Sequence, residues 1–143
     1  MALDIDFGCK ESWDDLQAGK VNFVVWGLGP DMKKPKLSLV AAGTGGFTEM
    51  KTHFKADALL FGGFRVLAVD VKRGLRSERP RIVGFKFAGT ATSTIKRARL
   101  SGFRAAILQL QTNTAATFEL IGVEPESFTM ERLPLFSSFW VLF

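Results

Sequence analysis

Apolar residues recur along this chain at two different spacings. Cys9, Trp13 and Leu16 stand at helical intervals before Gly19, which indicates a short amphipathic helix. In residues 64–71, by contrast, apolar side chains point to both faces of an extended segment, as in a strand covered on both sides. The same reading of the whole chain predicts helices at 9–18, 47–54, 92–110 and 125–132, and strands at 22–27, 37–42, 62–71, 81–88 and 117–121.

The order of these elements is helix, strand, strand, helix, strand, strand, helix, strand, helix. Strands and helices mixed in this way favour a single α/β (α+β) domain. We therefore expect a central mixed β-sheet of five to six strands, sandwiched between helices on both faces. An arginine-rich loop at residues 72–80 is expected to join the strands at 62–71 and 81–88.

The longest helical candidate, 92–110, contains one inconsistency. Its apolar stripe at helical spacing consists of Ile95, Phe103, Ala106, Ile107 and Leu110. On a continuous helix Arg99 would fall inside this stripe, although a charged side chain is out of place on a buried face. We therefore expect a break near Ser101 and Gly102, unless the side chain of Arg99 extends to water.

Length and composition limit the class of protein. With 143 residues, 47% of them hydrophobic and 23% charged, the chain can bury its own core. One cysteine excludes an internal disulfide framework, and the chain shows neither a leader pattern nor an apolar run of about 20 residues. We expect a soluble cytoplasmic protein with a domain at 1–132. The apolar tail at 133–143 either packs on that domain or forms an exposed docking peptide.

Positive charge is concentrated in one third of the sequence. Residues 72–104 have ten basic residues and one acidic residue, a net charge of +9. Residues 1–71 (eight basic, nine acidic) and 105–143 (one basic, four acidic) have net charges of −1 and −3, which completes the total of +5. Such segregation favours a basic surface that speeds association with an acidic partner, either protein or nucleic acid. The basic residues are Lys72, Arg73, Arg76, Arg79, Arg81, Lys86, Lys96, Arg97, Arg99 and Arg104.

Candidate catalytic chemistry is sparse. The single His53 and single Cys9 cannot build a Cys/His zinc site, and no nucleophile-elbow motif accompanies His53. The segment Gly43–Gly46 lacks the Gly-Lys-Ser/Thr ending of a phosphate loop and the spacing of a dinucleotide site. We therefore expect a protein that is not an enzyme and uses no cofactor or metal.

Four segments in the second half of the chain carry a resemblance to a known family. They are Phe64–Asp70, Arg79–Gly89, Thr94–Arg99 and Thr117–Ile121. In this order they are similar to a strand, a basic turn with its following strand, the motif Gly-Leu-Gln-Arg-Ala-Lys, and the last strand of coactosin-type proteins. These proteins belong to the actin-depolymerising-factor homology (ADF-homology) family. Cys9–Leu16 and Phe23–Trp26 are similar to its first helix and first strand.

The resemblance implies an ADF-homology fold and a non-catalytic protein that binds filamentous actin in preference to the monomer. It implies no small-molecule substrate and no membrane, and we expect a monomer at the cytoskeleton. The basic positions that match the family's filament-binding residues are Arg79, Arg81, Lys96, Arg97 and Arg99, and Arg81 replaces a lysine. With Arg73 and Arg76 of the adjoining segment, they form the predicted actin-binding set.

Two alternatives remain open at this point. Arginines interleaved with Phe85 and Phe87 could mark a nucleic-acid-binding module, although the Lys/Arg-Gly start of the RNA-recognition strand is missing. A filament-severing protein of the cofilin type, or a regulator of an actin-nucleating complex, would share the fold. Against cofilin, Leu3 and Asp4 stand where a phosphorylatable serine is expected. The chain also has an extra Leu-Arg pair at 75–76 relative to the family.

Overall fold

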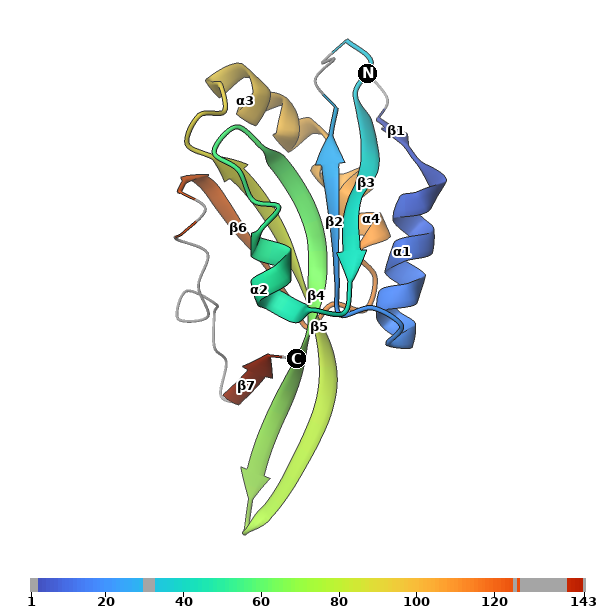
Figure 1. Cartoon of the computed structure of the whole chain (residues 1–143), viewed down its shortest axis with the longest axis vertical. Helices are drawn as coiled ribbons and strands as arrows, with labels where there is room; N and C mark the ends of the chain where they lie inside the picture. The colour runs from blue at the N-terminus through green and yellow to red at the C-terminus, as the bar shows by residue number, and fades with distance from the viewer. Residues whose placement is uncertain (1–2, 30–32, 125, 127–138, 143) are drawn as a thin grey trace.

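The computed structural model describes residues 3–29, 33–124, 126 and 139–142. It confirms a mixed α/β domain with the predicted order of elements (Figure 1), and adds the short strands β1 and β7 at the two ends. The predicted helix at 125–132 lies outside these residues, apart from residue 126. The elements are β1 (Asp4–Ile5), α1 (Phe7–Ala18), β2 (Phe23–Leu28), β3 (Lys36–Gly43), α2 (Gly46–Lys51), β4 (Leu59–Lys72), β5 (Leu75–Gly89), α3 (Thr94–Gly102), α4 (Arg104–Leu110), β6 (Ala116–Val123) and β7 (Phe139–Leu142).

The strands form one mixed sheet. Its order is β1-β3-β2-β4-β5-β6, and β7 pairs with β4 off this path. The β1–β3 and β5–β6 pairs are parallel, whereas β2–β3, β2–β4, β4–β5 and β4–β7 are antiparallel. The described sheet has seven strands rather than five to six, because β1 and β7 are short edge strands that the apolar pattern alone does not distinguish.

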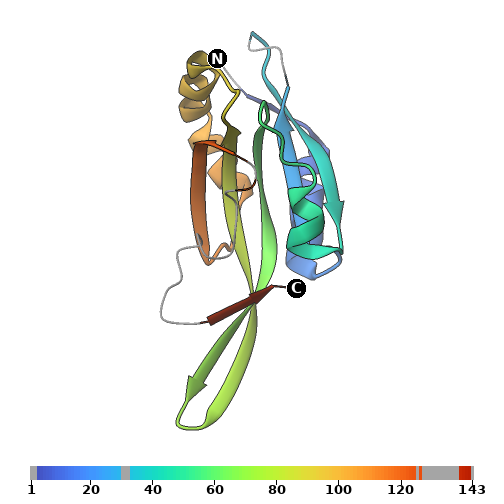
Figure 2. The ribbon, with the colours of Figure 1, turned by 60° about the vertical axis from the view of Figure 1, so that its left-hand side comes forward.

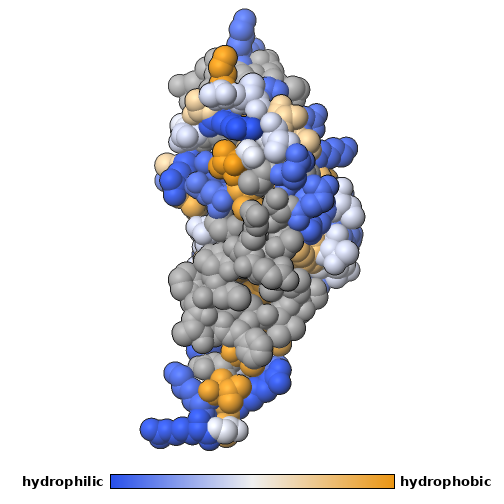
Figure 3. Space-filling model, turned by 90° about the vertical axis from the view of Figure 1, so that its left-hand side faces the viewer, coloured by the Kyte–Doolittle hydropathy of each residue, from blue (hydrophilic) through white to orange (hydrophobic). Residues whose placement is uncertain are grey.

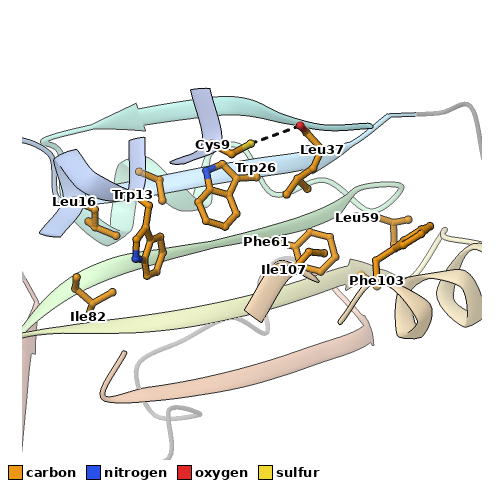
Figure 4. Close-up of a cluster of buried hydrophobic side chains, with 12 residues drawn as sticks. Cys9, Trp13, Leu16, Trp26, Leu37, Leu59, Phe61, Ile82, Phe103 and Ile107 are labelled. Carbon is orange, nitrogen blue, oxygen red and sulfur yellow. Dashed lines mark hydrogen bonds between the residues drawn. The ribbon is translucent and has the colours of Figure 1, made fainter. Parts of the chain in front are cut away.

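Each face of the sheet carries its own core. Trp13 of α1, Trp26 of β2 and Ile107 of α4 belong to one cluster of buried side chains (Figure 4). Phe47 and Met50 of α2 belong to a second cluster on the opposite face. Figure 1 shows α2 in front of the sheet and α4 behind it, so helices cover both faces as expected. This double cover explains why β4 is apolar on both sides along Leu59–Phe64. The two-sided cover predicted for 64–71 is wrong for the end of that segment, because β4 runs on past the helices and Val71 is 61% exposed.

The helix boundaries follow local signals in the sequence. Asp6 caps α1, where its Oδ1 accepts a hydrogen bond from the Gly8 N–H at 3.5 Å, and Gly19 ends the helix with φ 79°. The break expected near Ser101 and Gly102 is present, since α3 ends at Gly102 and α4 begins at Arg104. Helix α2 ends at Lys51 rather than at residue 54.

Candidate functional site

The hairpin of β4 and β5 extends from the body of the molecule as an arm, residues 66–81 (Figures 1 and 2). Residues 71–81 of this hairpin arm are exposed. Only Arg73 and Gly74 join its strands, and their φ angles of 52° and 78° are those of a two-residue type I′ turn. The prediction of a loop at 72–80 is therefore wrong. Because this turn needs only two residues with positive φ, the ladder continues to the pair of Lys72 with Leu75.

Two arginines of the hairpin arm share one face. Arg79 pairs with Ala68 and Arg81 with Val66, so they stand two residues apart on one strand. Val66 belongs to the core cluster beneath α2, which assigns both arginines to the α2 side of the sheet. Within the described part of the chain, neither arginine takes part in a salt bridge. The arm therefore presents two guanidinium groups on one face, and no carboxylate of the described residues pairs with either.

The free end of the hairpin arm is both charged and apolar. Arg76 Nε lies 2.7 Å from Glu78 Oε1, so its charge is partly compensated, whereas Arg73 stands in the turn itself. Val71 and Leu75 are 61% and 76% exposed. Figure 3 shows strongly hydrophilic residues on both sides of an apolar patch at this end. Arginine around a small apolar centre is a composition typical of protein interfaces.

The second basic group, on α3, has a different environment. Arg97 donates from Nε to Thr92 Oγ1 at 2.8 Å, and from Nη2 to the carbonyl oxygens of Gly89 at 3.1 Å and Thr90 at 3.2 Å. A Cβ built on Gly122 would lie 2.9 Å from Arg97 Nη1, so the guanidinium also packs against the backbone of β6. This arginine joins the end of β5 to α3 and β6, which is a structural role.

The other two predicted basic residues of this group, Lys96 and Arg99, also lie on α3. Lys96 is half-buried and lines a pocket with Asp57, and Arg99 lies on the same helix. Ile95 is 68% exposed, so its predicted place in the buried stripe is wrong. The predicted stripe is buried at Phe103, which directly precedes α4, and at Ile107 of α4, whose exposures are 7% and 2%. It does not include Ile95, because the break after Gly102 rotates α3 out of phase with α4.

The predicted set is thus divided between two places. Arg73, Arg76, Arg79 and Arg81 lie on the hairpin arm at one end of the molecule, whereas Lys96, Arg97 and Arg99 lie on α3 at the other end (Figure 1). Of the three other basic residues of the segment, Lys72 is on β4, next to the turn of the hairpin arm, and Lys86 and Arg104 lie 3.9 Å and 3.5 Å from Glu119 Oε1. The expected single basic face is therefore not formed.

The apolar tail contributes a strand at the base of the hairpin arm. Residues 139–142 form β7, which pairs antiparallel with Val66–Val69 of β4. These are the residues of β4 whose other partners are Glu78–Arg81. For this part of the tail, the structure shows strand pairing with the domain. Residues 133–138 lie outside the described chain.

Cys9 and His53, the residues considered for catalysis or metal binding, lie among side chains of the fold. Cys9 is fully buried; burial and the charge of Asp6 raise the pKa of its thiol to about 12, so it is a poor nucleophile. The ring of His53 lies 6.3 Å from that of Phe23. No cluster of metal-ligating side chains occurs among the residues that the structure describes. Nor does that part of the chain contain a helix long and apolar enough to cross a membrane.

The sequence analysis did not predict a role for one basic residue near the hairpin arm. Arg65, a half-buried residue of β4, donates from Nη1 to the Leu16 carbonyl oxygen at the end of α1 at 3.0 Å. Its guanidinium lies against Gly19, where a Cβ would stand 3.0 Å from Nη1. The sequence does contain a signal for this role: Arg65 stands alone between Phe64 and Val66. A charged side chain inside an apolar strand needs a hydrogen-bond or ion-pair partner.

Comparison with known proteins assigns the fold. The sequence profile described as cofilin/tropomyosin-type actin-binding protein matches residues 2–132. The chain belongs to this family. The members of this family are non-catalytic actin-binding proteins, and the chain has their fold. No curated protein sequence matches the chain.

Solved structures of this family share the architecture at low sequence identity. The crystal structure of coactosin from Entamoeba histolytica has a TM-score of 0.69 and 24% identity, covering 90% of this chain and 89% of that one. Human coactosin-like protein, solved by NMR, has a TM-score of 0.71 and 17% identity, covering 92% and 85%. Mouse coactosin, described as an actin filament binding protein, has a TM-score of 0.66 and 17% identity, covering 92% and 87%. At these identities the likeness shows the fold alone.

Proposed function

We propose that this protein binds the sides of actin filaments through its hairpin arm, without catalysis, and so regulates the cytoskeleton in the manner of coactosin. The observation that carries the proposal is the pair Arg79 and Arg81, exposed on one face of the arm and without a salt bridge in the described structure. Family membership supplies actin as the partner, and the description of mouse coactosin as an actin filament binding protein favours the filament.

The chemistry of the hairpin arm suits an acidic protein surface. Residues 71–81 hold five basic residues and one acidic residue, a net charge of +4. A guanidinium binds a carboxylate through two parallel hydrogen bonds, a geometry that lysine cannot supply. Pro80, between Arg79 and Arg81, fixes its own φ and holds Arg79 in an extended conformation. Both arginines are therefore oriented before the partner arrives, which lowers the entropy cost of binding.

The division of the basic residues makes the hairpin arm the primary surface of this proposal. On α3, Arg97 already donates to three oxygen atoms of its own chain. Lys96 and Arg99 stay as predicted secondary contacts. Because they lie at the other end of the molecule, they would meet a different part of the filament from the arm.

Co-sedimentation with actin filaments tests the proposal directly. Purified protein should pellet with filaments, and the bound fraction should fall as salt rises from about 50 to 300 mM, because screening weakens contacts between exposed charges. The control is binding to actin monomers held in the monomeric state, measured by fluorescence anisotropy, which should be weak. Absence from the filament pellet at low salt would refute filament binding.

Two further measurements separate the alternatives. Filament length, followed by microscopy after the protein is added, should stay constant, whereas rapid shortening would identify a severing protein of the cofilin type. Labelled RNA should show no binding at moderate salt. A steeply salt-dependent shift of the RNA without filament pelleting would identify a nucleic-acid-binding module instead.

A further inference from the structure

The free end of the hairpin arm exposes two large apolar side chains, one on each face of its ladder. Val71 pairs with Arg76, and Leu75 pairs with Lys72 in the next row toward the turn. Adjacent rows of a ladder point to opposite faces, so Val71 and Leu75 do so as well. Their exposed fractions are 61% and 76%, and neither side chain therefore buries much apolar area in the fold.

The same alternation divides the β5 strand of the hairpin arm into two rows of side chains. The register of β4 with β5 is continuous from Leu59–Ala88 to Lys72–Leu75, so no bulge exchanges the faces. One row contains Leu75, Ser77, Arg79 and Arg81, and the other contains Arg76, Glu78 and Pro80. All of these residues are exposed.

The two rows of β5 differ in net charge. The row of Leu75 has two arginines and no acidic residue, a net charge of +2. In the other row Arg76 Nε lies 2.7 Å from Glu78 Oε1, and the net charge is zero. Within the described part of the chain, neither Arg79 nor Arg81 forms a salt bridge. On this strand, only the row of Leu75 combines net positive charge with an exposed apolar side chain.

The row of Leu75 is long enough to act as one binding surface. Each residue of a strand advances by about 3.4 Å, so Leu75 is about 14 Å from Arg79 along the strand. A two-stranded ribbon has a right-handed twist, and the row follows this twist around the arm. The free end of the arm stands clear of the helices (Figures 1 and 2). A partner that contacts the whole row therefore needs a groove along the ribbon rather than a flat surface.

We propose that the hairpin arm binds its acidic partner by the row of Leu75, with Leu75 as an apolar anchor beyond the arginine pair. The partner site is a groove with carboxylates opposite Arg79 and Arg81 and an apolar hollow about 14 Å farther along. The inference rests on the proposed filament binding and deepens it. The arginines give electrostatic attraction and orientation, whereas burial of Leu75 adds a contact that does not depend on charge.

The position of Leu75 makes the anchor a feature of this chain. Leu75 belongs to the Leu-Arg pair at 75–76 that is extra relative to the family. It stands beside the turn, with Arg73 in the turn and Lys72 opposite. An apolar side chain with charged residues around it has the composition of an interface core and its rim (Figure 3). Relatives without the extra pair lack this anchor.

The variant Leu75→Thr tests the anchor, and Val71→Thr is its matched control. Both place the same polar, β-branched residue at the free end of the arm, on opposite faces, and threonine favours the strand. We expect Leu75→Thr to lower filament affinity about tenfold, because most of the apolar area of the leucine is lost. Val71→Thr should change it by less than about twofold, and Leu75→Met should stay within about twofold of the wild type. Equal losses in the two threonine variants would overturn the assignment to one row.

Salt dependence separates the anchor from the arginines. The loss caused by Leu75→Thr should keep the same factor between about 50 and 300 mM salt, because an apolar contact is not screened. The loss caused by Arg79→Ala/Arg81→Ala should shrink over the same range. If the loss in Leu75→Thr also disappears as salt rises, Leu75 acts only through the charged residues and is not an anchor.

Photo-cross-linking locates the contact without a polar substitution. Benzoylphenylalanine is placed at position 75 or at position 71 of the full chain, and each protein is irradiated on actin filaments. Position 75 should give a covalent product with the filament subunit, and position 71 should not. Equal yields from the two positions, or no product from either in protein that pellets, would overturn the proposal.

The filament assay distinguishes failure of this inference from failure of the proposed function. If Leu75→Thr pellets like the wild type while Arg79→Ala/Arg81→Ala does not, the anchor is wrong and the proposed function stands. If the wild type does not pellet with filaments, the proposed function fails and the anchor fails with it. A loss in Leu75→Thr, a normal Val71→Thr and a cross-link from position 75 alone would together support the anchor.

Discussion

The hairpin arm and α3 are both rich in arginine, yet they use it in opposite ways. On the arm, Arg79 and Arg81 stand exposed on an extended ladder, with no salt bridge in the described structure. On α3, Arg97 donates three hydrogen bonds to oxygen atoms at the end of β5 and in the turn after it. The arm therefore holds its charge ready for a partner, whereas α3 uses the charge of Arg97 to close the fold. A basic residue reports on function only after its own hydrogen-bond partners are known.

The largest effect that tests this contrast is expected on the hairpin arm. Arg79→Ala/Arg81→Ala should lower filament affinity at least about tenfold, because two charge-assisted contacts are lost together. The fold should persist, since exposed charges rarely contribute more than about 1 kcal/mol to stability. Co-sedimentation measures the affinity, and circular dichroism checks the fold.

The control for this pair is Lys10→Ala/Lys20→Ala, which removes the same charge from exposed positions on and just after α1. It should lower affinity by less than about twofold if the site, and not the total charge, decides binding. Equal losses in the two double variants would show that only net charge matters. A folded arm variant that pellets like the wild type would remove Arg79 and Arg81 from the site.

On α3 the expected effect is on stability instead. Arg97→Ala removes three hydrogen bonds and leaves the carbonyl oxygens of Gly89 and Thr90 without this donor, so the melting temperature should fall by about 3–10 °C. Arg97→Lys keeps the charge but cannot reproduce the bonds, and should lower the melting temperature nearly as much. At a temperature where both remain folded, filament binding should match the wild type. A loss of binding in Arg97→Ala without a change in melting temperature would place Arg97 in the binding surface.

The smallest effect separates two arginines within the hairpin arm itself. Arg76 lies against Glu78, with 2.7 Å between Nε and Oε1, so Arg76→Ala should lower filament affinity only about twofold. Glu78→Gln removes the compensating charge and should raise affinity by a similar factor. Co-sedimentation at low salt resolves such differences. If Arg76→Ala weakens binding as strongly as the loss of Arg79 and Arg81, the pairing does not reduce its contribution.

The sequence predicted most of the fold because the apolar pattern is strong. The stop at Gly19 and the break near Gly102 follow from spacing, capping and helix geometry. The short strands were not predictable in this way, because β1 has only two residues and β7 owes its existence to pairing with a distant part of β4. Long-range register of this kind leaves little trace in local sequence.

The site was predicted less completely, for a physical reason. Counting charges along the chain does not show where the folded chain places them. Arg79 lies on the hairpin arm and Arg97 on α3, at opposite ends of the molecule. The sequence of residues 72–80 predicts a loop because the interval is rich in arginine and contains both a glycine and a proline. Cross-strand pairing organises it instead, and polar residues on an exposed hairpin satisfy that pairing as well as apolar ones do. The hydrogen bond of Arg65 was not predictable either, because its acceptor, the Leu16 carbonyl of α1, is 49 residues away in the chain.

The two-residue turn at Arg73–Gly74 also bears on how this molecule could have changed over time. A ladder closed by such a turn lengthens when one residue is added to each strand, by about 3.4 Å for each added pair. The rows nearer the body, such as Arg79 with Ala68, keep their register and their face. A single insertion in one strand would instead create a bulge or send every later side chain to the other face. Leu75 and Arg76, the pair beyond the family pattern, lie beside the turn, where an insertion extends the reach and leaves the body untouched.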